Sequence, residues 1–114
     1  MDVNLTLNQL TMSNNGFNRL KAMTGANHFF KDNNSVGFQF KMCKKANALK
    51  ITLNSMDTYD LLFYKIGKKV NKEYAKVGIK IYDITTKDIQ SYENIYCDQL
   101  KEIFEQFTGL YLSL

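Results

Sequence analysis

The feature that most constrains this chain is a run of alternating apolar and polar residues between positions 36 and 66. Two segments carry the alternation, at residues 36–42 and 49–53, and a third apolar segment follows at residues 59–66, with short polar turns between the three. A two-residue period is typical of strands with one buried face. The third segment is apolar in both phases, which indicates a strand covered on both sides. Because short turns join antiparallel neighbours, the pattern predicts an antiparallel meander.

Two further segments show the same alternation. Residues 77–84 predict a fourth strand, which follows a loop at residues 67–74. Residues 3–7 alternate as well and predict either a short strand or a partly ordered arm. Residues 26–35 are mostly polar and end in a turn signal, so we expect a connection there.

Helical spacing appears on either side of the predicted sheet. Residues 14–24 place Phe17, Leu20 and Met23 on one stripe, with Gly25 suited to a left-handed C-terminal cap. A longer helix is predicted from Thr85 or Thr86 onward, ending at Gly109. Its stripe consists of Ile89, Tyr92, Tyr96, Leu100, Ile103, Phe104 and Phe107. The apolar residues 110–114 are expected to fold back onto the core.

The order of these elements predicts the α+β class. We expect an antiparallel meander sheet of three to four strands, with a possible extra N-terminal strand and two helices packed on one face. Residues 1–12 would form an N-terminal arm or short strand, and residues 13–114 a single domain. The predicted core consists of Phe38, Ile51, Phe63, Ile79, Tyr96, Leu100 and Phe104.

The residues needed for common catalytic and metal sites are scarce. The chain has one histidine, His28, and two cysteines, Cys43 and Cys97, without zinc-ligand spacing or an evident nucleophile–base pair. Glycine-rich phosphate loops are absent from the sequence. We therefore expect a protein that is not an enzyme and has no metal, cofactor or small-molecule substrate. The cysteines are expected to be reduced thiols, with a single bridge between them as the alternative.

Targeting features are also absent from the sequence given. Residues 1–10 lack a basic start, a long apolar run and a small-residue cleavage site. No apolar stretch approaches the ~20 residues that span a bilayer. We expect a cytoplasmic protein without a membrane partner.

Charge is divided unevenly along the chain. The formal net charge is +4, which splits into +8 for residues 1–81 and −4 for residues 82–114. The predicted strands put Lys41, Lys50 and Lys80 in the polar phase, so these lysines would share the open sheet face. A basic face with interleaved aromatic side chains can hold nucleic acid. Alternatively, the lysines only hydrate the face and discourage edge pairing. The candidate nucleic-acid-binding residues are Lys41, Lys50, Lys68, Lys69, Lys72, Lys80 and Tyr82.

Two segments carry a resemblance to known proteins. NRLKAMTGA at residues 18–26 and TGLYLSL at residues 108–114 resemble small proteins of phages from AT-rich hosts, a group without an assigned activity. The element order also loosely resembles a double-stranded-RNA-binding domain, although TKDIQ at residues 86–90 lacks that family's basic motif.

The phage resemblance implies two classes of partner. One is nucleic acid or a nucleoprotein complex, and the other is a host protein that the chain would inhibit stoichiometrically. A structural virion component is a third reading. For a protein partner, large hot-spot side chains are favoured, and Arg19, Tyr74 and Tyr111 are the candidates.

Overall fold

The computed structural model describes residues 1–112 and contains a five-stranded antiparallel meander. The strands lie in the order β1-β2-β3-β4-β5, which is also their order in the chain. Their bounds are Asn27–Lys31 for β1, Ser35–Gln39 for β2, Ala48–Leu53 for β3, Tyr59–Val70 for β4 and Tyr82–Ile95 for β5. The predicted α+β class and meander are confirmed, with one strand more than predicted.

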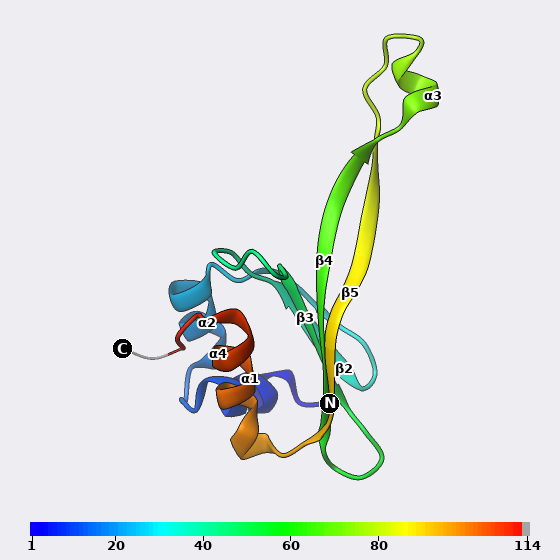
Figure 1. Ribbon diagram of the computed structural model, residues 1–114. Helices are drawn as coiled ribbons and strands as arrows, with labels where there is room; N and C mark the ends of the chain where they lie inside the picture. The colour runs from blue at the N-terminus through cyan, green and yellow to red at the C-terminus, as the bar shows by residue number, and fades with distance from the viewer. Residues whose placement is uncertain (113–114) are drawn as a thin grey trace.

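Helices cover one face of this sheet (Figure 1). The helices are α1 (Val3–Thr11), α2 (Gly16–Thr24), α3 (Lys72–Ala75) and α4 (Leu100–Thr108), with a 3-10 turn, η1, at Cys97–Gln99. Three of them, α1, α2 and α4, pack on the sheet, whereas α3 lies at the far end of β4 and β5. No helix in the described part of the chain is long and apolar enough to cross a membrane.

The core lies between these helices and the apolar phase of β2, β3 and β4. Phe104 of α4 occupies its centre, with its ring centroid 6.5 Å from that of Phe38 and 6.2 Å from that of Phe63. Leu100, one turn earlier, is fully buried beside it. The predicted core positions Phe38, Ile51, Phe63, Leu100 and Phe104 are therefore confirmed.

Two predicted core positions are wrong. Ile79 is 50% exposed and Tyr96 is 62% exposed. Ile79 lies in the connection between α3 and β5, and Tyr96 lies between β5 and η1. Both lie outside the elements to which the sequence pattern had assigned them.

The N-terminal segment is a helix, not a strand. Asp2 caps α1 by accepting a hydrogen bond from the Leu5 amide at 3.1 Å. Leu7 and Leu10 are buried, whereas Leu5 is 51% exposed. The buried positions thus follow helical spacing, and the alternation seen in residues 3–7 does not reflect burial.

The region from residue 77 to residue 99 also differs from prediction. Residues 77–81 form a connection, so the fourth strand predicted at 77–84 is confirmed only at residues 82–84, where β5 begins. The long helix predicted from residue 85 begins only at Leu100. β5 occupies the interval instead. Tyr92 and Ile95 are three residues apart and both pack against the core, because a register shift in the pairing of β4 with β5 lies between them. Their spacing resembles helical periodicity.

A strand was also missed at β1. Its pairing with β2 is irregular between Asn27 and Phe30, and His28 between them has a φ of 51°. The Phe30 ring fills the space above Gly37 that a side chain would occupy.

In the C-terminal segment, Leu112 is buried as predicted, and the predicted packing of Leu114 lies outside the described residues.

Candidate functional site

The most prominent feature of the molecule is a two-stranded arm that projects from the sheet (Figure 1). β3 pairs with β4 only as far as the Ala48–Tyr64 pair, whereas β4 and β5 remain paired out to Val70 and Tyr82. We call residues 65–87 the arm. Its paired strands extend for about 20 Å at ~3.3 Å per residue. The arm accounts for much of the 52 Å long axis of the molecule.

Asn47 anchors the arm at its base. The side-chain nitrogen of Asn47 donates to the carbonyl of Ile66 at 2.9 Å, and the side-chain oxygen of Asn47 accepts from the backbone amide of Ile66 at 2.7 Å. These two hydrogen bonds from the Asn47 side chain take the place of the backbone hydrogen bonds that β3 would make to β4 if it extended beyond Ala48. Lys65 adds a bond from Nζ to the carbonyl of Lys44 at 3.1 Å. The arm therefore leaves the sheet in a defined direction.

The tip of the arm is an ordered loop around α3. The Asn71 amide donates to the carbonyl of Ile81 at 2.8 Å, which closes residues 71–81 into a loop. The Asn71 side chain caps α3 by accepting from the Glu73 amide at 3.0 Å, and it donates to Asp83 at 3.2 Å. Gly78 turns the chain with a φ of +82°.

Positive charge is concentrated on the arm. It contains Lys65, Lys68, Lys69, Lys72, Lys76, Lys80 and Lys87. Its acidic residues are Glu73 and Asp83, so its net charge is +5. Because the whole chain is +4, the remaining residues have a net charge of −1. Of that remainder, residues 1–64 have a net charge of +3 and residues 88–114 a net charge of −4, so the arm supplies most, but not all, of the positive charge seen in the sequence.

The two faces of the ribbon differ in character. Directly paired residues share a face, so Lys65 and Lys87 lie together, as do Lys69 and Asp83. The opposite face carries four apolar or aromatic side chains with one lysine and one threonine: Ile66, Lys68, Val70, Tyr82, Ile84 and Thr86. Ile84 is 73% exposed and Tyr82 is also exposed. The arm thus presents lysines and rings, without burying either.

The structure does not bring the three predicted sheet-face lysines together. Lys50 lies on the open face of β3, where Asp60 and Glu93 line the same shallow hollow. Lys41 follows the end of β2, and its aliphatic chain lies against Gly25 of α2. Lys80 lies at the tip of the arm. A continuous basic sheet face is therefore absent from the described residues.

The other predicted nucleic-acid-binding residues do gather in one place. Lys68, Lys69, Lys72 and Tyr82 all belong to the arm, together with Lys80. Three further lysines of the same element were not predicted: Lys65, Lys76 and Lys87. The sequence feature that could have placed them there is the run of β-branched residues Ile84, Thr85 and Thr86. Such a run favours a strand, which would pair with residues 65–70.

The candidate protein-binding residues are dispersed. Tyr74 lies on α3 at the tip of the arm, whereas Arg19 lies on α2 and Tyr111 follows α4. Tyr74 and Tyr111 are exposed, and Arg19 is half-buried. Tyr74 therefore joins the lysines of the arm, and the other two belong to the body of the molecule.

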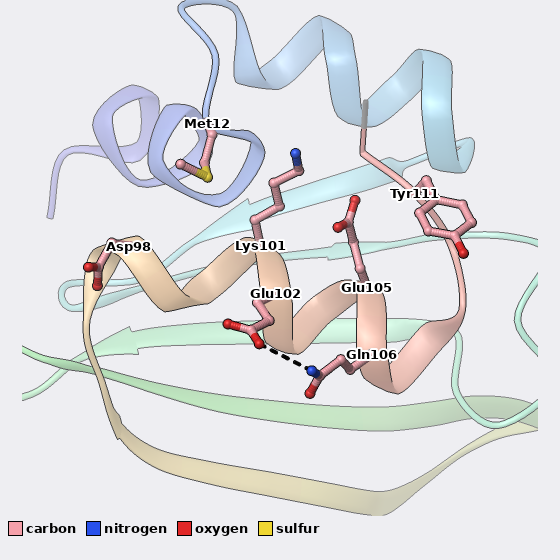
Figure 2. A pocket seen from close by; sticks show the side chains of 7 residues that line it. All are labelled: Met12, Asp98, Lys101, Glu102, Glu105, Gln106 and Tyr111. Carbon is pink, nitrogen blue, oxygen red and sulfur yellow. Dashed lines mark hydrogen bonds between the residues drawn. The ribbon is translucent and has the colours of Figure 1, made fainter. Parts of the chain in front are cut away.

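A second hollow lies beside α4 and is acidic (Figure 2). Its volume is about 490 Å³, and it is lined by Met12, Asp98, Lys101, Glu102, Glu105, Gln106 and Tyr111. Glu102 accepts from the Gln106 amide nitrogen at 3.2 Å, and Glu105 accepts from the Leu112 backbone amide at 2.8 Å. These bonds hold the helix and the C-terminal segment, so two of the three carboxylates already have structural partners.

Catalytic geometry is not assembled around the histidine or the cysteines. His28 is exposed, and its Nδ1 lies 2.6 Å from the side-chain oxygen of the adjacent Asn27. Cys43 and Cys97 are both free thiols. Among residues 1–112, no group of three or more His, Cys, Asp or Glu side chains is arranged to hold a metal ion.

Comparison of the chain with family models, curated proteins and solved structures finds no match.

Proposed function

We propose that this chain is a non-enzymatic binding protein that engages duplex DNA through the arm. The observation that carries the proposal is the net charge of +5 on the arm, against −1 for all other residues. Lysines that contact phosphates release condensed counterions, which supplies most of the sequence-independent affinity for DNA. The rest of the molecule has no comparable attraction for a polyanion.

The shape of the arm supports the same proposal. Its two strands lie about 4.8 Å apart, and a two-stranded ribbon fits the major groove of B-form DNA, which is ~12 Å wide. Ribbons also bind in the minor groove. The major groove of duplex RNA is deep and narrow, so side chains cannot read it. DNA is accordingly the duplex that we propose.

The environment of His28 supports a non-enzymatic role. Its hydrogen bond goes to the amide side chain of Asn27, and an amide is not a nucleophile that the imidazole could activate. The alternative is a host-protein partner, which the exposed apolar side chains of the arm would also suit. The two partners differ in their response to salt, because only DNA binding releases condensed counterions.

The test is fluorescence anisotropy with a short labelled DNA duplex over a range of salt concentrations. The log–log slope is about −0.9 for each phosphate contact. The triple variant Lys68→Ala, Lys72→Ala, Lys76→Ala should therefore flatten the slope by about 2–3. A matched control replaces Lys31, Lys41 and Lys50 of the body by Ala, which removes the same charge and should leave the slope unchanged.

Three results would contradict the proposal. Equal effects of the two triple variants would mean that net charge matters and the arm does not. A larger effect of the body variant would indicate that DNA binds at the sheet face predicted from the sequence and not at the arm. Absence of duplex binding by the unmodified protein at low salt would remove the function altogether.

A further inference from the structure

The end of the arm carries exposed apolar side chains that do not pack into the hydrophobic core. Val77 is 70% exposed, and Ile79 lies two residues further on. Gly78 lies between them at the turn, with a positive φ. Neither side chain belongs to the hydrophobic core cluster of the described residues or packs against it. The exposed pair therefore requires an explanation that the fold does not supply.

The backbone holds this pair in place. The Ile79 amide donates to the carbonyl of Tyr74 at 3.0 Å, and the Gly78 amide donates to the carbonyl of Ala75 at 3.1 Å. Valine and isoleucine are branched at Cβ, so their χ1 angles are restricted. The tip thus presents two stiff apolar groups from a hydrogen-bonded loop, at little further cost in conformational entropy on binding.

Charge selects the kind of partner that fits the tip. Lys76 precedes Val77, and Lys80 follows Ile79, so a cation flanks the apolar pair on each side. A second copy of the chain would bring another arm of net charge +5 against this one, and the two would repel. A ligand with an anionic exterior and an apolar interior matches both features. Stacked base pairs between phosphate backbones have that chemistry.

Ribbons bind DNA in either groove, and insertion of apolar side chains takes place from the minor groove. We infer that the arm uses the minor groove, where Val77 and Ile79 form a wedge that inserts between adjacent base pairs and bends the duplex. This inference rests on the proposed function. Apolar side chains inserted at a base step unstack it and kink the duplex toward the major groove. Lys76 and Lys80 would neutralise the phosphates on either side of the opened step. Pyrimidine–purine steps such as TA unstack most easily, so the wedge should favour them.

The test uses a duplex with a donor dye at one end and an acceptor at the other, so that bending raises energy transfer. Anisotropy of the same duplex reports binding. Saturation with the unmodified protein should raise the transfer, and more so for a central TA step than for a stiff A-tract. The double variant Val77→Ser, Ile79→Ser should bind with the same salt slope and lose the rise. Val77→Ile, which keeps the wedge, should retain it.

A control variant replaces Met42 and Met56 by Ser, because both are exposed apolar side chains of the body. It should bend the duplex as the unmodified protein does. Circular dichroism will show whether each variant is folded, and these exposed positions leave the core intact. Binding without a rise in transfer would overturn the wedge and leave the proposed function standing. Absence of binding by the unmodified protein would overturn both.

Discussion

The backbones of α1 and α2 approach closely at Gly16, the first residue of α2. A Cβ added at Gly16 would overlap the carbonyl group of Leu7 and lie 2.6 Å from the backbone nitrogen of Asn8. All of these are backbone atoms, so no side-chain rotation relieves the overlap. Restoring ordinary contact near 3.4 Å would require α1 and α2 to separate by roughly 1 Å. Gly16→Ala therefore tests the packing of the N-terminal helix directly.

The expected cost combines two effects. Forcing extra volume into a packed contact destabilises by about 1–3 kcal/mol. Separation of the helices would also stretch the 2.8 Å hydrogen bond from the Gly16 amide to the Asn8 side chain, at roughly 1 kcal/mol. We expect the free energy of unfolding to fall by about 2–4 kcal/mol, as measured by urea denaturation with far-ultraviolet circular dichroism.

Asn18→Ala is the matched control, because Asn18 is exposed on the same helix. It should change the free energy of unfolding by less than about 0.5 kcal/mol. The same small change for Gly16→Ala would refute the helical packing of residues 3–11. The N-terminal segment would then be the short strand or partly ordered segment that the alternation in residues 3–7 suggests.

Two further predictions concern the core and the base of the arm. Leu100→Ala should cost about 2–5 kcal/mol in chemical denaturation, whereas Ile79→Ala should stay within about 0.5 kcal/mol, and equal costs would contradict the burial described here. Burial raises the pKa of Tyr64 above its ordinary value, so the folded state favours the neutral phenol. This contribution to stability is present below the unfolded pKa of about 10 and is lost as pH rises through the folded pKa. Tyr64→Phe should therefore lessen the decline in the free energy of unfolding above that pH. An identical decline in both proteins would contradict the raised pKa of Tyr64.

The central strands were predictable because their burial follows their sequence period. In β2, β3 and β4 the apolar phase faces the helices, so Phe38, Ile51 and Phe63 could each be assigned to the core. Gly25 likewise ends α2 with a φ of +68°, as its lack of a side chain allows. Where local pattern and tertiary packing agree, the sequence alone was sufficient.

The periphery was not predictable by the same argument. α1 shows alternation at Leu5 and Leu7, but packing against α2 buries only the second of them. In β5, a register shift in the pairing with β4 lets Tyr92 and Ile95, three residues apart, both pack against the core. A helical interpretation explains that spacing equally well. These outcomes depend on contacts distant in sequence, which periodicity does not encode.

The candidate site was predictable in its residues but not in its geometry. Lys68, Lys69, Lys72, Lys80 and Tyr82 were all named from charge and phase, yet they were expected around an open sheet face. Their common location depends on β4 continuing past Tyr64 and pairing with β5 as far as Val70. A loop was predicted at residues 67–74, although in the structure Gly67 pairs with Thr85 within the ribbon.

The central claim is that the arm binds DNA, and removing the arm tests it most directly. Ile66 and Thr86 are paired, so an Asn-Gly turn can join them in place of residues 67–85 while keeping the bonds to Asn47. None of the removed residues belongs to the core cluster, so the shortened chain should stay folded. We predict that it loses measurable affinity for a DNA duplex at low salt. Affinity and salt dependence equal to those of the full chain would contradict the account.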